Sequence, residues 1–217
     1  DRIEAARAAL QALGGDVLAV RADVTKLDDL ERLVAATVER WGRIDGLVNN
    51  AGQSAAKELV DSTDQEWEAD LALKLHAAVR LCRFTLDHLA EHGGAIVNVL
   101  ATGAKTPTAS SMPSSVSRAA GMALTKALSK EVGPRNVRVN AVLIGLVESG
   151  QWERVAERSS TPVERLYENM AERSSIPLGR VGRAEEFADL AAFLLSPRAG
   201  YVTGTAINLD GGLSAAV

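Results

Sequence analysis

Two apolar runs near the start of the chain end in residues that can bind a ligand. The run VLAVRADV ends in Asp23 and Val24, and the run GLVNN leads into Asn49, Asn50, Ala51 and Gly52. Aspartate and asparagine side chains form hydrogen bonds with ligands, and a backbone without a β-carbon lets a sugar or a phosphate approach closely. These residues are therefore candidates for a binding site. The alternative is that Asp23 caps the following helix and Asn49 ties adjacent strands together.

The other reactive side chains exclude two kinds of site. Cys82 is the only cysteine, and the three histidines, His76, His88 and His92, lie on one predicted helix without a cysteine partner. Neither a disulfide framework nor a zinc site is expected from this set. A lone cysteine is typical of a reducing compartment, so we expect a cytoplasmic protein.

Composition and charge narrow the possible functions further. The chain has 217 residues, of which 47% are hydrophobic and 24% charged, and its net charge is −4. This length predicts one globular domain, 1–217, and the lack of a polybasic run disfavours a nucleic-acid partner. The sequence has no run of about 18 apolar residues and no secretory signal pattern in its first ten residues, so no membrane partner is expected.

Hydrophobic periodicity and turn signals predict alternating helices and strands. Helices are predicted over 1–13, 25–41, 64–90, 114–132 and 183–195, and strands over 17–24, 46–50, 95–100, 137–143 and 206–210. Because the strands are nearly continuous apolar runs, they predict a doubly wound α/β fold in which a parallel sheet lies between two layers of helices. The polar segment 150–175 is interpreted as a helical lid over the site.

Parallel strands place their carboxyl ends at one edge of the sheet, where such folds bind ligands. Four residues, Asp23, Asn49, Ala101 and Ile144, come at or just after the ends of four predicted strands. We therefore expect them to cluster, and this edge is the candidate site.

Six blocks, in the same order along the chain, resemble the short-chain dehydrogenase/reductase family. They are Asp23-Val24, Asn49-Asn50-Ala51-Gly52, VNV (97–99), SRAAGMALTKAL (117–128), RVNAV (138–142) and YVTGTAINLDGG (201–212). The resemblance covers essentially the whole chain. It implies a Rossmann-like fold, NAD(P)(H)-dependent oxidation or reduction of alcohols and carbonyls, and a homo-oligomer, either a dimer or a tetramer.

The resemblance implies NAD or NADP as the cofactor. In the family, an aspartate at the position of Asp23 binds adenine, and the Asn-Asn-Ala-Gly backbone lies against the adenosine ribose. A later Pro-Gly, with a threonine four residues after the glycine, holds the nicotinamide. Here the proline is replaced by Ile144, and Ser149 keeps a hydroxyl at the position of the threonine. The implied cofactor-binding residues are Asp23, Val24, Asn49, Asn50, Ala51, Gly52, Gly145 and Ser149.

The front of the family pattern is missing from these 217 residues. Members of the family begin with a strand, a Thr-Gly-x-x-x-Gly-x-Gly turn, a helix and a second strand, whereas this chain opens in the helix that follows. We expect the natural protein to carry these elements before Asp1, because the strands 17–24 and 46–50 would otherwise leave unpaired edges. The binding site for the pyrophosphate of the cofactor and the choice between NAD and NADP both depend on the missing elements.

All four catalytic positions of the family are substituted. Alignment places Lys74 at the family's asparagine, Ala101 at its serine, Ser114 at its tyrosine and Arg118 at its lysine. A serine hydroxyl is far too weak an acid to replace a phenol, and Ala101 has no donor for a substrate oxygen. We therefore expect tyrosine-dependent catalysis to be absent and ketone reduction to be slower than is typical of the family.

Only a few residues offer a group that can take the place of the missing catalytic side chains. Thr102 offers a hydroxyl if its loop shifts register, and Tyr167 offers a phenol, although packing of the lid is its simpler role. Tyr201 matches a structural tyrosine of the family. Lys74 and Arg118 either face one pocket, where they can hold an anionic ligand, or extend separately into solvent.

Three interpretations remain open. The chain is an oxidoreductase that uses unconventional residues, a non-catalytic module for binding or assembly, or a fragment of a longer protein. Family members usually pair through the helices that correspond to 64–90 and 114–132 and through the last strand. The second helix has a stretch that offers small residues for close helix approach, unless this stretch faces the sheet: Ala119, Met122, Ala123, Lys126 and Ala127.

Overall fold

The computed structural model of the chain describes residues 2–217. The predicted helix start at Asp1 lies outside the described residues. Four parallel strands form one sheet in the order β1-β2-β3-β4. They are β1 (Gly46–Asn49), β2 (Ala95–Ala101), β3 (Arg138–Ile144) and β4 (Ala206–Leu209).

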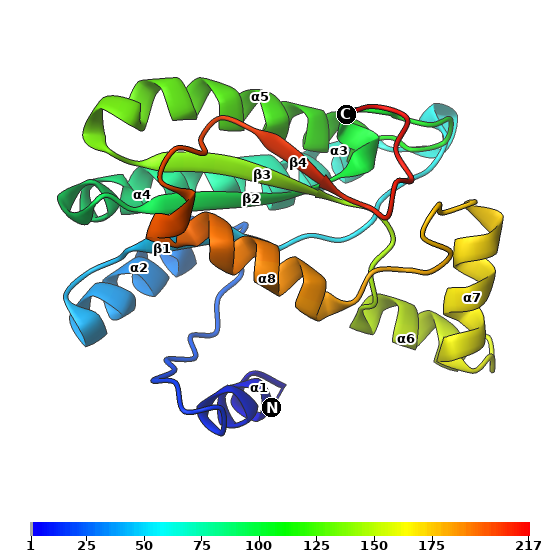
Figure 1. Cartoon of the computed structure of the whole chain (residues 1–217), viewed down its shortest axis with the longest axis horizontal. Helices are drawn as coiled ribbons and strands as arrows, with labels where there is room; N and C mark the ends of the chain where they lie inside the picture. The colour runs from blue at the N-terminus through cyan, green and yellow to red at the C-terminus, as the bar shows by residue number, and fades with distance from the viewer. Residues whose placement is uncertain (1) are drawn as a thin grey trace.

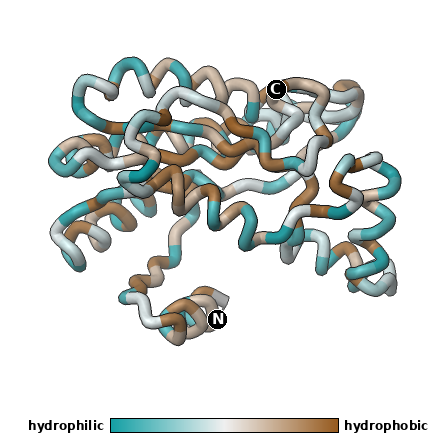
Figure 2. Tube along the Cα trace, in the orientation of Figure 1, coloured by the Kyte–Doolittle hydropathy of each residue, from teal (hydrophilic) through white to brown (hydrophobic). Residues whose placement is uncertain are grey.

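Helices cover both faces of the sheet, as the apolar strands require. Helices α4 (Ala77–His92) and α5 (Ser114–Val132) pack on one face, and α8 (Ala184–Leu195) packs on the other (Figure 1). This arrangement confirms the predicted doubly wound, Rossmann-like α/β fold with three layers. The apolar residues gather along the strands (Figure 2), because β2 and β3 are covered from both sides and are almost completely buried.

A glycine brings α5 close to the sheet at the level of the candidate site. A β-carbon at Gly121 would lie 2.7 Å from Cδ2 of Leu100 on β2, which is closer than van der Waals contact allows. This close approach places the first turns of α5 beside the carboxyl end of β2, where the candidate site lies.

The predicted strand 17–24 is wrong: this segment is extended but forms no strand. A strand needs a neighbouring backbone to satisfy its N–H and C=O groups, and among the described residues β1 pairs only with β2. The segment instead forms hydrogen bonds with side chains of α2 (Leu27–Trp41). The Asp23 N–H donates to Asp29 Oδ2 at 2.7 Å, and Arg32 donates to the Arg21 carbonyl at 2.7 Å.

The predicted helix 64–90 is a continuous helical run with a change of geometry in its middle. It consists of α3 (Asp64–Leu71), a π-helical turn (Ala72–His76) and α4. A capping box between Thr63 and Glu66 starts the run. The widened turn is a feature that often occurs at functional sites, and it contains Lys74.

The remaining helices lie at the periphery (Figure 1). Helix α1 (Arg2–Gln11) precedes the extended segment, and α6 (Gly150–Arg158) and α7 (Val163–Arg173) fold the segment predicted as a lid. None of the helices in residues 2–217 combines the length and the apolar character needed to cross a membrane. Cys82 is buried on α4, and burial raises the pKa of its thiol to about 11, so the thiol stays protonated at neutral pH.

Candidate functional site

A cleft of about 660 Å³ opens at the carboxyl ends of the strands, where the sequence predicted a site. A second cavity, of about 400 Å³, shares seven of its lining residues with the first. These shared residues come from the carboxyl-terminal parts of β2 and β3, from the loop after β1 and from the start of the segment predicted as a lid: Asn50, Ser54, Val99, Ala101, Ile144, Ser149 and Gln151. The expected clustering is therefore confirmed for Ala101 and Ile144, and Asn50 represents the end of β1.

A buried ion pair lies beneath this cleft. Lys74 and Asp70 are one helical turn apart, their side chains form a salt bridge, and each side chain is only 1% exposed. Ser117 donates a hydrogen bond of 2.6 Å to the other oxygen of Asp70. The prediction that Lys74 can extend into solvent is wrong, because Asp70 compensates the ammonium inside the protein.

The Lys74 ammonium also reaches Ser114, the residue at the tyrosine position. Lys74 Nζ donates to Ser114 Oγ at 2.8 Å, and the Ala55 N–H donates to the same oxygen at 2.9 Å. A hydroxyl oxygen has two lone pairs and one proton, so both lone pairs of Ser114 are engaged. Its own proton is left for an acceptor in the cleft, which Ser114 lines.

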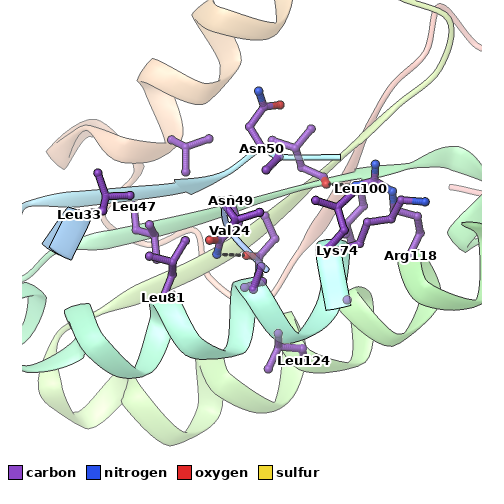
Figure 3. A pocket seen from close by; sticks show the side chains of 18 residues that line it. Val24, Leu33, Leu47, Asn49, Asn50, Lys74, Leu81, Leu100, Arg118 and Leu124 are labelled. Carbon is purple, nitrogen blue, oxygen red and sulfur yellow. Dashed lines mark hydrogen bonds between the residues drawn. The ribbon is translucent and has the colours of Figure 1, made fainter. Parts of the chain in front are cut away.

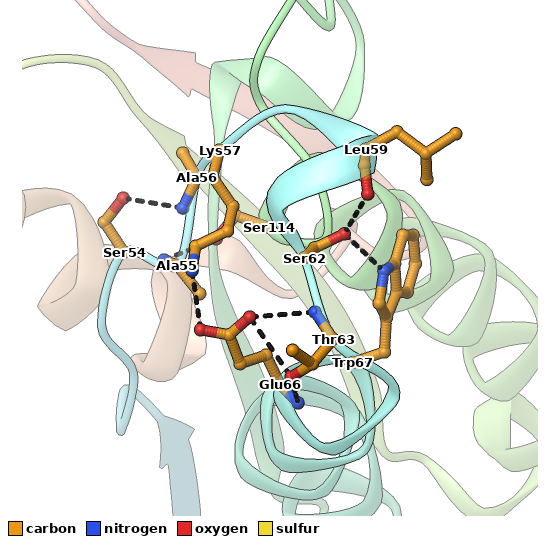
Figure 4. Close-up of polar contacts among 10 residues, drawn as sticks. All are labelled: Ser54, Ala55, Ala56, Lys57, Leu59, Ser62, Thr63, Glu66, Trp67 and Ser114. Atoms are coloured by element: carbon orange, nitrogen blue, oxygen red, sulfur yellow. Dashed lines mark hydrogen bonds and ion pairs between the residues drawn. The ribbon is translucent and has the colours of Figure 1, made fainter.

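Hydrogen bonds and an ion pair hold the loop that carries Ala55 over Ser114 (Figure 4). Lys57 Nζ bonds Glu66 Oε1 at 2.6 Å, and the same carboxylate accepts from the Thr63 N–H at 2.9 Å. The backbone N–H of Lys57 donates to the Met112 carbonyl just before α5. These contacts join the loop to both α3 and α5, so the position of the donor against Ser114 is fixed by the fold.

Arg118 lies one turn after Ser114 on α5, and its guanidinium is half-buried. One nitrogen donates to the Val99 carbonyl at 2.5 Å, and another lies 2.8 Å from the point where a β-carbon of Gly52 would stand. Gly52 therefore makes room for this guanidinium. Lys74 and Arg118 lie close together at one end of a smaller cavity of about 180 Å³ (Figure 3), as expected if they face one pocket.

The pKa values of Lys74 and Arg118 both lie below their ordinary values. Burial lowers the pKa of the Lys74 ammonium, the hydrogen bond and charge of Asp70 oppose this effect, and the Arg118 charge lowers the pKa further. Burial also lowers the pKa of Arg118, and Asp70 again opposes it. A lowered pKa makes the ammonium a stronger acid than a solvated lysine.

Neither predicted substitute for the missing tyrosine reaches the cleft. Thr102 lines neither cavity, and its carbonyl accepts from Lys105 and Thr106 in a short 3₁₀ turn. The hydroxyl oxygen of Tyr167 accepts from the Ser149 N–H at 3.3 Å while its ring packs in the lid, as its simpler role predicts. Tyr201 is fully exposed.

The residues predicted to bind adenosine are partly engaged within the protein. One oxygen of Asp23 accepts from the N–H and hydroxyl of Thr25, which lower the pKa of the carboxyl. These bonds form a turn ahead of α2, whose N-cap is Lys26 without a side-chain bond, so the alternative that Asp23 caps this helix is wrong. Asn49 donates to Asn98 at 2.8 Å and so ties β1 to β2. The amide oxygen of Asn49 is nevertheless buried with no hydrogen-bond partner among the described residues. Val24, Asn49, Asn50 and Ala51 line the 180 Å³ cavity together.

The residues predicted to bind nicotinamide lie in the 400 Å³ cavity. Gly145 and Ser149 both line it, together with Ala101. A β-carbon at Gly145 would come within 2.7 Å of the β-carbon of Asp210, so this position also requires glycine for packing.

Three contributors to the site were missed from the sequence. Asp70 could have been found, because an aspartate four residues before a lysine on a helix forms an ion pair. The Ala55 N–H meets Ser114 across 59 residues, and no local pattern signals such a contact. Arg154 of α6 lines the 660 Å³ cleft, although the segment was interpreted only as a lid.

Comparisons with known proteins find similarity to reductases. A family model described as Enoyl-(Acyl carrier protein) reductase matches residues 1–214. The chain is 33% identical over 193 residues to the 3-oxoacyl-(acyl-carrier-protein) reductase FabG of Thermotoga maritima, covering 88% of this chain and 74% of that protein. It is 38% identical over 201 residues to the granaticin polyketide synthase putative ketoacyl reductase 2 of Streptomyces violaceoruber, covering 91% of this chain and 77% of that protein.

A solved structure is similar over the whole chain. It is the NADPH-bound short-chain oxidoreductase of Pseudomonas aeruginosa PAO1, described as containing an atypical catalytic center. The identity is 35%, the TM-score is 0.93, and the match covers all of this chain and 84% of that one.

Proposed function

Because the chain belongs to the short-chain dehydrogenase/reductase family, we propose that it is an NAD(P)-dependent oxidoreductase of carbonyls or alcohols that moves the proton through Ser114 and Lys74 instead of a tyrosine. One observation carries the proposal. The Lys74 ammonium lies 2.8 Å from Ser114 Oγ, and the Ser114 side chain lines the cleft. The relatives named as oxoacyl and ketoacyl reductases support a ketone as the oxidised substrate.

The residues present fit the two ends of a dinucleotide. At the adenosine end, Val24 and the segment 49–51 line one cavity, and the unpaired Asn49 oxygen is a free acceptor nearby. At the nicotinamide end, Gly145 and Ser149 line the 400 Å³ cavity. We propose that Asp23 and Gly52 also belong to the adenosine side and that Arg118 holds ribose hydroxyls. The described residues contain no glycine-rich turn for the pyrophosphate.

The proton path follows from the hydrogen bonds at Ser114. When bound, the cofactor supplies the hydride. Ser114 then gives its proton to the substrate oxygen as negative charge develops there, and Lys74 Nζ gives a proton to Ser114 Oγ. Lys74 is left as a neutral amine beside Asp70 and regains a proton from water in the cleft. Serine alone is too weak an acid for this step, but here it only relays a proton from the lysine.

Turnover by this path is expected to be slow. A well-placed general acid contributes about 10²- to 10⁴-fold, and the median enzyme turns over about ten times per second. The protein is therefore expected to reduce ketones at about 10⁻³ to 10⁻¹ per second. Turnover should also fall as the pH rises through the pKa of Lys74, because reduction needs the ammonium form.

Replacing Ser114 by alanine tests the relay. The Ser114→Ala variant is expected to lose about 10²-fold in turnover, because the cleft loses a hydrogen-bond donor to the developing oxyanion. Cofactor affinity, measured by fluorescence titration with NADPH and NADH, should change little. The Ser62→Ala variant is the control, because Ser62 also bonds through its hydroxyl but does not line the cleft. Equal turnover in the Ser114 variant and the unmodified protein would contradict the relay.

A non-catalytic binding or assembly module is the second candidate. The substitution of all four catalytic positions favours it. The same assay separates the two candidates, since such a module would bind NADPH or another ligand without oxidising it over a panel of ketones and quinones.

We also propose that the protein forms a dimer or a tetramer. Met122 packs against the sheet, as the alternative predicted, but Ala123 and Ala127 are exposed on the outer face of α5 and leave room for a second helix. Light scattering at micromolar concentration should therefore give two or four times the 22.9 kDa of the chain. A mass near that of one chain would contradict this. A cytoplasmic location remains a proposal that the single buried thiol supports.

A further inference from the structure

The 660 Å³ cleft has an uneven distribution of charge. Three cationic side chains line it, Lys74, Arg118 and Arg154, and no aspartate or glutamate of the described residues does. The chain as a whole is acidic, with a net charge of −4. The positive charge is therefore a local property of the cleft and does not follow from the overall composition.

The buried carboxylate of Asp70 does not fully neutralise the cations of the cleft. Asp70 forms the ion pair with Lys74, and its charge is also felt by Arg118, so one carboxylate serves two cations. Arg118 donates only to a backbone carbonyl among the described residues. An excess positive charge at a half-buried site attracts an anion more strongly than it would in bulk water.

Arg154 brings a second excess charge from the lid. It lies on the first turns of α6, facing the cleft that Ser114 lines, and its side chain forms no salt bridge among residues 2–217. Glu153 is the nearest carboxylate on the same helix: its Oε2 lies 3.6 Å, and Arg154 Nη1 3.4 Å, from the point where a β-carbon of Gly150 would stand. Glu153 forms no salt bridge with Arg154 and does not line this cleft, and Glu148 lines only the 400 Å³ cavity. If Arg118 holds the ribose, Arg154 remains available for a group on the substrate.

From this arrangement we propose that the substrate is an oxo acid, whose carbonyl oxygen meets Ser114 and whose carboxylate binds Arg154. The inference rests on the proposed function and adds the substrate class. A guanidinium presents a planar pair of donors that matches a carboxylate, and such charge-assisted bonds are stronger than neutral ones. Arg118 contributes to the field that attracts the anion. A phosphate of the cofactor is the other anion that these cations can bind.

Matched substrates separate the carboxylate from the carbonyl. The test measures kcat and KM for 2-oxobutanoate, 4-oxopentanoate and the methyl ester of each acid. At least one acid is expected to have a KM about 10- to 100-fold below that of its ester, and the Arg154→Gln variant should remove this difference. The control is Arg173→Gln on α7, which removes the same charge from the exposed surface of the lid. Acids and esters that are reduced equally well would overturn the inference and leave the proposed function intact.

Two further measurements complete the test. The Kd of NADPH should be the same in the Arg154→Gln variant and the unmodified protein; if it rises while the KM of the acids does not, the arginine serves a cofactor phosphate and the inference fails. If no ketone is reduced, the proposed function fails, and calorimetry with 4-oxopentanoate decides the inference alone. Binding of the acid but not of its ester, lost in Arg154→Gln, supports it, and equal or absent binding of the two contradicts it.

Discussion

Replacing Lys74 by methionine is expected to lower the free energy of unfolding by about 3–5 kcal/mol. The substitution leaves the carboxylate of Asp70 buried without its cation, and the side chains of both residues are only 1% exposed. The hydrogen bond from Ser117 then remains, but one hydroxyl does not compensate a buried charge. Urea unfolding followed by circular dichroism measures the effect.

A second substitution shows whether the buried charge is the cause. The double variant Lys74→Met/Asp70→Asn removes both charges and should recover most of the lost stability. The exposed pair Arg165 and Glu168 on α7 is the control, because removing Arg165 should change stability by less than about 1 kcal/mol. A Lys74→Met variant as stable as the unmodified protein would show that the ammonium is not needed to hold Asp70 in the core.

Rebuilding the family's catalytic residues is expected to raise ketone reduction by about 10²- to 10⁴-fold. The variant carries Lys74→Asn, Ala101→Ser, Ser114→Tyr and Arg118→Lys. A phenol with a neighbouring ammonium is a far better acid at working pH than a serine hydroxyl, and the serine restores a donor to the substrate oxygen. Restoring tyrosine at 114 alone should recover little, because such residues act as a unit.

A companion variant protects this experiment from a folding failure. The triple variant Ala101→Ser/Ser114→Tyr/Arg118→Lys keeps the Asp70–Lys74 pair and so avoids the loss of stability described above. Steady-state rates with NADPH and NADH on the same ketones are compared for both variants, after circular dichroism confirms that they are folded. No gain in either folded variant would mean that proton transfer does not limit the unmodified protein.

The elements that depend on local pattern were predictable from the sequence. Helix α5 begins at Ser114 and ends at Val132, as its periodicity indicated. The prediction of a strand over 17–24 was wrong. Its apolar residues indicate burial, but a strand also needs a neighbouring strand with which its backbone can pair. The π-helical turn at Lys74 was also beyond the sequence, since no local signal distinguishes it from an ordinary helical turn.

The position of the candidate site was predicted from the sequence, but the hydrogen bonds within it were not. The alignment of Lys74, Ser114 and Arg118 with family positions placed them in one cleft, where the structure has them. What the sequence could not reveal is that Lys74 bonds Ser114, because the hydrogen bond joins helices 40 residues apart. The judgement that Ser114 is too weak an acid considered the serine alone, whereas the proposed relay draws its proton from the ammonium beside it.

The most direct test of a tyrosine-independent reaction uses a chain without tyrosine. Tyr167 and Tyr201 are the only two in the sequence, and neither lines the cleft. Rates of ketone reduction are measured for the variant Tyr167→Phe/Tyr201→Phe, for Ser114→Ala and for the unmodified protein under identical conditions. We predict that the tyrosine-free variant keeps its turnover within about twofold while Ser114→Ala loses about 10²-fold. Loss of turnover in the tyrosine-free variant, with Ser114→Ala unaffected, would contradict the account.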